Sequence, residues 1–431
     1  MTTPMAQKKL RVYDAQPVGA VCQSPVNLET MTQGQWIALD GRDCIRSQYP
    51  EIQSMFPAGV FTSTARALAA TSNAPTIVAD NTNFLTPGAA GTSALQASPT
   101  GGVGSDWVQS ATWGASTAVK SIVVAGTRYV IAGTAGDMSA PYVYATGNTA
   151  ANTVAKANWT ATTGGASTTL TQGLAYGSTA NAGAGRTVLC INGSQATATG
   201  LFYMNDAATA WNACSGGSTQ TRQTICWSGQ KFFVFMTTGT LYQVSSDGAT
   251  FADAYLPVSA LQASFAPLSC ASDGNGTIVL LTQFAEGAAT SLVFGALVSK
   301  DHGATWRTVQ FPEYNHRQIA VLYFVKYANG KFFAGYGGAT GTVFVSSDGL
   351  NWFSEPITGG RGILIGMYDI AYKAGVYCGN GYNATDALTA TEDMSKFRIP
   401  KFTINHCNQS NGEYVLPSTA TIPVYMKARS N

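Results

Sequence analysis

The chain has 431 residues, of which 45% are hydrophobic and only 11% are charged, whereas an ordinary soluble domain has roughly 25% charged residues. With 24 Lys and Arg against 22 Asp and Glu, the formal net charge is +2, too small to create the field that attracts nucleic acid or an anionic membrane surface. The length favours two cores or one repetitive architecture. The apolar and aromatic content excludes a disordered chain.

We expect neither a membrane span nor a secretory signal. The best apolar run, residues 121–133, is shorter than a spanning helix requires and is interrupted by Arg128. Near the N-terminus, Lys8, Lys9 and Arg11 are not followed by an apolar segment. The sequence therefore predicts a protein that is made and folded in a cytoplasm.

The cysteines and histidines predict no metal site and no cofactor. Eight cysteines are dispersed without a C-x-x-C pair, and the three histidines show no zinc-ligand spacing. Cys190, Cys226, Cys270 and Cys378 lie in or beside strand-like runs, which indicates buried, reduced thiols. Gly-x-Gly runs occur without the strand-to-helix context of a phosphate loop, so they are interpreted as turns.

The pattern along the chain is that of an all-β protein. Gly, Thr, Ser and Asn separate short runs of Val, Ile, Tyr and Phe, and helical periodicity is almost absent. The clearest unit, residues 322–356, contains four strand candidates, and a similar plan recurs over 224–254 and 276–309. Repeats of four short strands are typical of the blades of a β-propeller.

Each of these three units contains a turn with serine, aspartate and glycine, followed by an aromatic residue. We expect the Asp and Ser oxygens to accept backbone N–H groups, the glycine to adopt positive φ, and the ring to pack between neighbouring sheets. The residues assigned to these structural turns are Asp247, Gly248 and Phe251; Ser299, Asp301, Gly303 and Trp306; and Asp348, Gly349 and Trp352.

Weaker copies of the turn extend the series of aromatic anchors. The full series stands at positions 159, 211, 251, 306, 352 and 397, with spacings of about 40 to 55 residues that suit a four-stranded blade. The turn resembles the Asp-box repeat, S-x-D-x-G-x-x-W, of sialidase-like and related β-propellers. The copy that begins at Ser299 fits this spacing, and the other two clear copies are one residue shorter before the glycine. We therefore expect a propeller of about six blades over residues 108–400.

The two ends of the chain carry different motifs. The N-terminal part contains PVGAV at 17–21, QWIALDG at 35–41 and RSQYP at 46–50, and the C-terminal part contains YVLP at 414–417 and VYMKA at 424–428. These segments resemble the phage tail-collar module, although the D-L-R-G-R-F phrase of that family is missing.

The collar resemblance implies a small α+β domain built from both termini, residues 1–60 and 401–431. The propeller would be inserted into this domain. Residues 61–107 are rich in Ala, Thr, Ser and Gly and are expected to be a connector.

Together the resemblances imply a non-enzymatic receptor-binding protein of a bacteriophage tail fibre or baseplate. The collar-like part would attach to other virion tail or baseplate proteins or form a homotrimer, and the propeller would contact a glycan or protein of the host surface. A purely structural tail component without host affinity is the first alternative. A glycan-cleaving sialidase-like enzyme is the second. The arginine triad of sialidases is not recognisable, no F/Y-R-I-P motif precedes the first blade, and the Arg398-Ile399-Pro400 segment stands at the wrong end of the propeller.

The longer loops are the candidates for receptor binding. In an Asp-box propeller, the loops between the second and third strands and between blades emerge opposite the Asp boxes. Long loops on a rigid scaffold commonly carry binding residues. On this basis Tyr314, His316 and Tyr382 are assigned to a common receptor-facing surface, although a loop can also be long because it contacts a neighbouring subunit.

Overall fold

The computed structural model divides the chain into two compact units, residues 1–60 with 392–431, and residues 61–391. The structure describes residues 21–23, 36–39, 43–45, 61–65, 76–88, 95–101, 106–109, 113, 118–134, 140–164, 171–181, 183–191, 200–257, 265–285, 292–311, 321–337, 342–359, 367–381, 386–391, 396–398 and 424–427. Most of them form strands, and the helices in this described part are α3 (Ala150–Val154) and the 3₁₀ turn η4 (Lys156–Asn158).

The unit made from the two chain ends contains a three-stranded antiparallel sheet. In it β33 (Val424–Lys427) lies between β1 (Val21–Gln23) and β2 (Trp36–Ala38). A further antiparallel pair joins β3 (Asp43–Ile45) to β32 (Lys396–Arg398). Trp36, Ile37 and Tyr425 are buried. Strands from opposite ends of the sequence therefore share one sheet.

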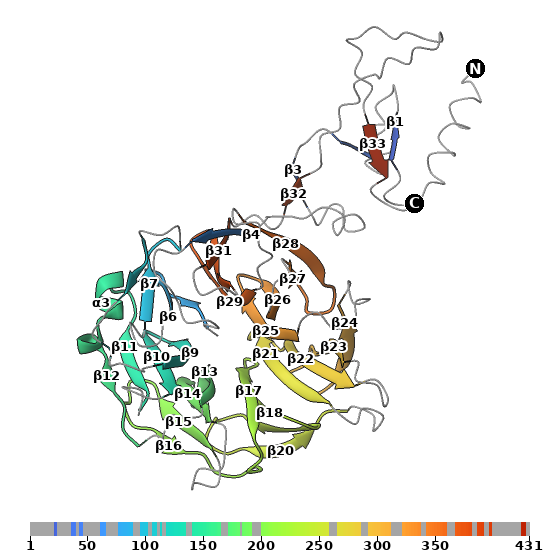
Figure 1. The fold of residues 1–431 in the computed structure, drawn as a ribbon. Coiled ribbons are helices and arrows are strands. Elements are labelled where there is room, and N and C mark those ends of the chain that lie inside the picture. Colours follow the sequence, from blue (N-terminus) through green and yellow to red (C-terminus); the bar gives the residue numbers. More distant parts are fainter. Residues whose placement is uncertain are drawn as a thin grey trace, which may run out of the picture. The chain divides into compact units, whose positions relative to one another are not determined.

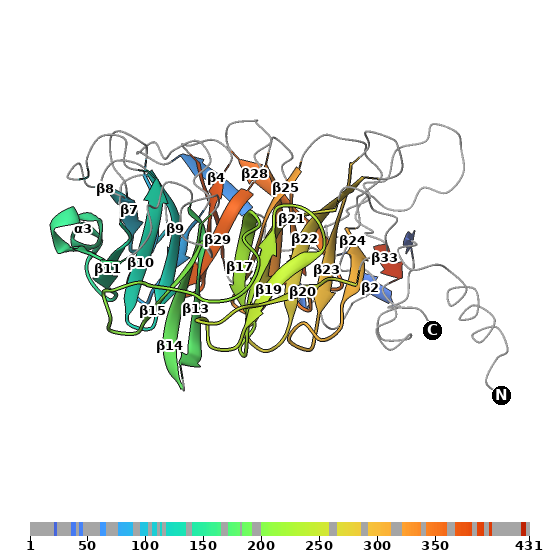
Figure 2. The same cartoon turned by 90° about the horizontal axis from the view of Figure 1, so that it is seen from below.

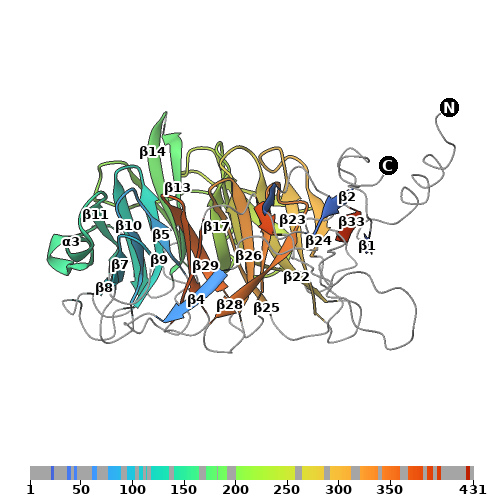
Figure 3. The same cartoon turned by 90° about the horizontal axis from the view of Figure 1, so that it is seen from above.

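Residues 61–391 form a ring of blades around a central axis, which confirms the predicted all-β propeller (Figure 1). Six blades in the described part of the chain are each an antiparallel meander of four consecutive strands. The hairpin of β13 and β14 extends beyond its neighbours (Figure 3).

The strands of the first three blades are, in blade 1, β5 (Val78–Ala79), β6 (Phe84–Pro87), β7 (Leu95–Ser98) and β8 (Val108–Gln109); in blade 2, β9 (Ala118–Ala125), β10 (Arg128–Thr134), β11 (Tyr142–Ala145) and β12 (Thr160–Ala161); and in blade 3, β13 (Thr171–Asn181), β14 (Ala184–Ile191), β15 (Leu201–Asn205) and β16 (Asn212–Ala213). Those of the next three are, in blade 4, β17 (Arg222–Trp227), β18 (Phe232–Met236), β19 (Leu241–Ser245) and β20 (Ala252–Tyr255); in blade 5, β21 (Ala266–Ser272), β22 (Ile278–Ala285), β23 (Leu292–Ser299) and β24 (Arg307–Gln310); and in blade 6, β25 (Val321–Ala328), β26 (Lys331–Gly337), β27 (Thr342–Ser346) and β28 (Phe353–Gly359).

A composite sheet closes the ring between blade 6 and blade 1. We call it the closing sheet; it contains β29 (Met367–Lys373), β30 (Val376–Gly381), β31 (Asp386–Thr391) and, as its outer strand, β4 (Phe61–Ala65). β4 pairs antiparallel with β31 and parallel with β28 of blade 6, and the side view shows it beside β28 (Figure 2). Because β4 precedes blade 1 in the sequence, hydrogen bonds between distant segments hold the ring closed.

Five of the six predicted aromatic anchors lie between neighbouring blades. Trp159 packs in a cluster with Leu85 and Leu95 of blade 1, and Trp352 packs in a cluster with Val279 of blade 5. The other three also contact the preceding blade, and they are Trp211, Phe251 and Trp306. The sequence therefore located the contacts between blades correctly at these positions. Position 397, the sixth anchor, lies in β32 and outside the propeller unit.

The predicted boundaries of the propeller need correction at both ends. Residues 61–107, expected to be a connector, contain β4 and most of blade 1, and the propeller unit ends at 391 rather than 400. Phe84, Leu85 and Leu95 are fully buried, and the polar side chains of Thr86 and Gln96 are buried beside them. The small and polar composition that suggested a linker is instead that of a closely packed strand meander, in which hydrogen-bonded polar groups can be buried.

The serine and aspartate of each predicted turn hold the turn together through side chain-to-backbone hydrogen bonds. In the third turn, Ser346 Oγ donates to Asp348 Oδ1 over 3.0 Å and accepts the Gly349 N–H over 2.8 Å. Asp348 Oδ1 also accepts two backbone N–H groups, and the Trp352 indole N–H donates to the Gly349 carbonyl over 2.9 Å. Gly349 has a φ of 75°. Equivalent bonds form around Asp247 and Asp301, so these aspartates have a structural role.

We expect the turn of blade 5 to make the free energy of unfolding depend on pH between about 4 and 2. Donors from Thr305, through its hydroxyl at 2.5 Å and its backbone N–H at 2.8 Å, lower the pKa of Asp301 to about 2. A lowered pKa means that the folded state favours the ionised carboxylate. Its contribution is complete above about pH 4, where aspartate ionises in the unfolded chain, and is lost as the pH falls through about 2.

We therefore expect the melting temperature of the wild type to fall more steeply between pH 4 and pH 2 than that of Asp301→Asn. Melting curves recorded by circular dichroism at pH 5, 4, 3 and 2 measure this difference. Thr305→Val keeps the carboxylate but removes the hydroxyl donor, so its profile should lie between the other two. Parallel profiles for the wild type and Asp301→Asn would show that this turn does not contribute to the acid sensitivity.

Candidate site in the central channel

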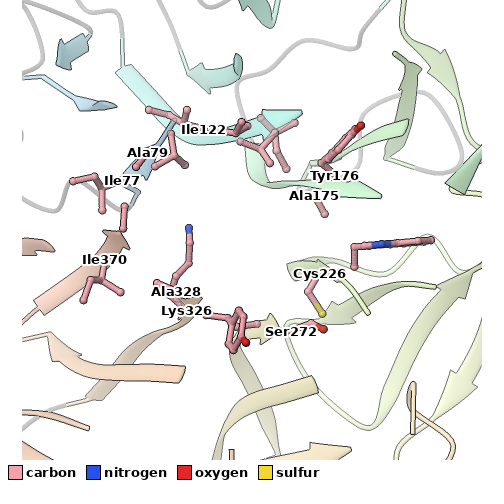
Figure 4. A pocket seen from close by; sticks show the side chains of 18 of the residues that line it. Ile77, Ala79, Ile122, Ala175, Tyr176, Cys226, Ser272, Lys326, Ala328 and Ile370 are labelled. Carbon is pink, nitrogen blue, oxygen red and sulfur yellow. The ribbon is translucent and has the colours of Figure 1, made fainter. Parts of the chain in front are cut away.

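The innermost strands of the six blades and of the closing sheet surround a cavity of about 420 Å³. Its walls come from β5, β9, β13, β17, β21, β25 and β29, each of which contributes a few consecutive residues (Figure 4). The volume lies in the range of small-molecule pockets, roughly 300–1,000 Å³. Because each blade supplies so few residues, the whole ring is needed to form the site.

Five of the inner strands each contain a β-bulge at an equivalent position. The bulges lie directly before Gly173, Thr224, Ser269, Phe324 and Asp369. Counting from these residues aligns the strands, so that equivalent side chains occupy the same level of the channel.

Hydrogen bonds at the level of the bulge join neighbouring inner strands. Thr224 Oγ1 accepts the backbone N–H of Cys270 over 3.2 Å, and Ser269 Oγ accepts that of Val325 over 3.2 Å. Asp369 Oδ2 accepts the Ile77 N–H over 2.8 Å, which joins the closing sheet to blade 1. These bonds satisfy backbone donors that lie outside the ladders of the individual sheets.

The position two residues after the bulge carries a small side chain in four of the aligned strands, and these residues are Ala175, Cys226, Ala271 and Ala371. In β25 the same position is occupied by Lys326. Lys326 Nζ lies 3.2 Å from Asp369 Oδ2, and the side chains are 34% and 6% exposed, respectively. Burial raises the pKa of the Asp369 carboxyl above its ordinary value, although Lys326 and the Ile77 N–H act in the opposite direction.

Aromatic side chains line the cavity one residue further along. They are Tyr176, Trp227, Tyr327 and Tyr372, all partly buried. Three of them pack on an aromatic ring of the adjoining strand, with centroid distances of 4.6 Å for Trp227–Phe232, 4.9 Å for Tyr327–Phe332 and 4.9 Å for Tyr372–Tyr377.

The fourth ring, Tyr176, is held by a hydrogen bond instead. Its hydroxyl donates to Asp206 Oδ2 over 2.9 Å. Burial and this bond raise the pKa of Tyr176 to about 12, so the phenol stays neutral. Each of the four rings thus has a contact within the protein that orients it, which limits the conformational entropy that binding a ligand would cost.

The aromatic end of the cavity lies on the face that carries the Ser–Asp turns. Trp227, Tyr327 and Tyr372 lie at or next to the ends of their inner strands, beside the hairpins that lead to the second strands, whereas Tyr176 lies in the middle of the longer β13. In blade 5 the corresponding hairpin contacts the Asp turn directly, since the His302 N–H donates to the Gly276 carbonyl over 3.0 Å. This cavity is therefore a different feature from the loop surface expected on the opposite face.

The receptor-binding candidates from the sequence, Tyr314, His316 and Tyr382, lie outside the described residues, so their assignment stays a prediction. The channel site was missed because each blade contributes only a few residues to it. One signal was present in the sequence, a lysine within the strand run LYFVKY. Its meaning depends on which residues occupy the equivalent positions of the other strands.

The described cysteines do not form a reactive or metal-binding centre. Cys190, Cys214, Cys226, Cys270 and Cys378 are buried and unbridged, as the sequence predicts for reduced thiols. Burial raises the pKa of both Cys190 and Cys214 to about 12, which suppresses the thiolate form. Within the described residues, no group of three or more His, Cys, Asp or Glu side chains is arranged to hold a metal ion. No helix in the same part of the chain is long and apolar enough to span a bilayer.

No protein-family model and no curated protein sequence matches the chain. Among solved structures, the chain is similar to a streptogramin B lyase, with a TM-score of 0.53 and 9% identity over 78% of this chain and 98% of that chain. It is also similar to YCF48 bound to D1 peptide (TM-score 0.48, 12% identity, 79% and 98% coverage) and to the Pan2 WD40 domain of Neurospora crassa (0.49, 7%, 85% and 97%). At this level of identity the likeness concerns the propeller fold alone.

Proposed function

We propose that this protein is a host-adhesion component of a bacteriophage tail, and that it acts by binding rather than by catalysis. The observation that carries the proposal is the sheet in which β33 lies between β1 and β2. It brings together segments from both chain ends that resemble the tail-collar module. This pairing supports the interpretation of the propeller as an insertion into an attachment domain.

In this proposal the two units have separate tasks. The unit of residues 1–60 and 392–431 attaches to other tail or baseplate proteins, and the propeller contacts a glycan or protein of the host surface. A cavity lined by aromatic side chains that contacts within the protein orient suits recognition, because little conformational entropy is then lost on binding.

Four of the described aspartates have structural roles, which supports binding over glycan cleavage. Asp247, Asp301 and Asp348 accept hydrogen bonds within their own turns, and Asp369 accepts hydrogen bonds from Lys326 and the Ile77 N–H. A glycosidase needs two carboxyl groups about 5–10 Å apart on either side of a scissile bond. The four aspartates instead stabilise turns and contacts between strands.

The test is whether the purified full chain binds host cells and blocks adsorption of the particle that carries it. We expect saturable binding to susceptible cells and a dose-dependent loss of adsorption, with no effect on strains that the particle does not adsorb to. Particles with Tyr314→Ala, His316→Ala and Tyr382→Ala combined test the predicted loop surface, which should lose adsorption while assembly stays normal.

The other outcomes separate the alternatives. Failed assembly of the triple variant, together with no cell binding by the purified chain, would favour a structural tail component. Release of reducing sugar from host polysaccharide, abolished by a single carboxylate substitution, would favour an enzyme. Normal assembly with unchanged adsorption of the triple variant would show that the loop surface does not bind the host. The cavity in the channel would then remain the candidate binding site.

A further inference from the structure

Lys326 places a positive charge in a cavity whose walls are otherwise largely apolar. Ile77, Ile122, Leu174, Ile225 and Ile370 line the same cavity. Figure 4 shows the Lys326 side chain pointing into the open centre between the strands. An ammonium group has three N–H donors, and one of them is directed to Asp369 at 3.2 Å.

The ion pair gives the lysine a fixed direction without enclosing it. Asp369 is 6% exposed and is anchored by the Ile77 N–H, whereas Lys326 remains 34% exposed. A buried ion pair is often no more stabilising than apolar side chains of similar volume, so stability alone does not account for a lysine at this level. Its exposed part is available to a ligand in the cavity.

The strand that carries Asp369 also supplies an aromatic residue to the cavity wall. Lys326 of β25 reaches Asp369 of β29, and Tyr372 follows three residues later on β29 as part of the cavity wall. Its ring is held against Tyr377. Ser272 and Asn329 also belong to the lining; Ser272 Oγ accepts the Gly274 N–H, and Asn329 Nδ2 donates to the Tyr377 hydroxyl. The cavity thus combines a cation, aromatic residues and a few polar residues.

We propose that this cavity binds a carboxylate-bearing pyranose, such as a hexuronate unit of an acidic polysaccharide. The carboxylate accepts hydrogen bonds from Lys326 Nζ, and the C–H face of the sugar packs on the aromatic residues. A hydroxyl of a neutral sugar can also accept a hydrogen bond from the ammonium, but a carboxylate makes a bond between two charged groups, which is stronger. The inference rests on the proposed adhesion function and names the chemical class of the host ligand.

The test uses glucuronate and galacturonate, each compared with its own methyl ester, because the ester removes the charge and keeps the sugar. Isothermal titration calorimetry on the full chain should show that at least one acid binds about tenfold or more tightly than its ester, the size expected for one charged hydrogen bond. Lys326→Met should abolish this preference, and Lys326→Arg should retain most of it. Tyr372→Leu should weaken the acid and the ester alike.

Controls separate binding from folding. Lys231→Met removes an exposed lysine of the hairpin between β17 and β18 and should leave the preference unchanged. Each variant is first checked by its melting curve, and Lys326→Met combined with Asp369→Leu replaces the pair without leaving a buried charge. This double variant should bind the acid no better than the ester.

Several results would overturn the inference. If the protein binds each acid and its methyl ester with equal affinity, for both sugars, Lys326 does not recognise a carboxylate. Binding of butyrate as tightly as of the uronates would show that no sugar is recognised. Cell binding that neither uronate inhibits would contradict this inference while the adhesion function stands. Conversely, uronate binding by a chain that binds no cells would contradict only the adhesion function.

Discussion

Trp352→Ala is expected to lower the free energy of unfolding by about 3–5 kcal/mol, as found for emptying a buried aromatic site. Trp352 is 5% exposed and lies between blades 5 and 6, with its ring 4.8 Å from that of Phe311. The substitution also removes the hydrogen bond from the indole to Gly349. The melting temperature should fall by roughly 5–10 °C, measured by circular dichroism or calorimetry.

Substitutions of two other aromatic residues serve as controls for Trp352→Ala. Tyr255 on β20 is 71% exposed, so Tyr255→Ala should change the melting temperature by no more than about 1–2 °C. Trp306 is only partly buried against blade 4, so Trp306→Ala should have an intermediate effect. If Trp352→Ala behaves like Tyr255→Ala, the aromatic anchors do not stabilise the contacts between blades.

Asp369→Ala should destabilise the protein by about 3 kcal/mol. The change leaves the buried Ile77 N–H without its acceptor and Lys326 without its ion-pair partner. An orphaned buried donor costs roughly 1–3 kcal/mol, and loss of one member of a buried pair adds to this, although the partial exposure of Lys326 limits that second contribution. Chemical denaturation with a linear extrapolation measures the loss.

The comparison variants identify which contact matters. Asp369→Asn keeps an oxygen that can accept the Ile77 N–H, so it should lose about half as much stability. Lys326→Met combined with Asp369→Leu removes both charges and should recover part of the loss of Asp369→Ala. A loss below about 0.5 kcal/mol for Asp369→Ala, the usual effect of a surface substitution, would show that this contact does not hold the closing sheet to blade 1.

The boundaries of the propeller could not be found from local patterns. Blade 1 lacks the Ser–Asp turn that identified blades 4, 5 and 6, and its Ala, Thr and Ser residues resemble a linker until their burial is known. β4 is separated from β31 by about 300 residues of sequence. Nothing in a five-residue strand specifies so distant a partner, because pairing is decided by which sheet edge the folded ring leaves open.

The channel site likewise depends on the assembled ring. Lys326, Asp369 and Tyr372 occupy ordinary strand positions, and each could face a core or solvent according to register. Only the β-bulges and the order of the sheets place Lys326 among small side chains and opposite Asp369. A single sequence cannot reveal that a lysine replaces the small residue of the other strands, because the equivalent positions are recognised only once the strands are aligned in space.

The sequence by itself determined the repeating unit of this protein. The periodic runs of Val, Ile, Tyr and Phe, the serine and aspartate of the turns, and the rings of Trp306 and Trp352 act within one blade and its neighbour, so local chemistry was enough to predict an all-β propeller. The tertiary structure alone decided the closing strand, the extent of the ring and the contents of the channel. These features arise from contacts between residues far apart in the chain, and only the closed ring brings those residues together.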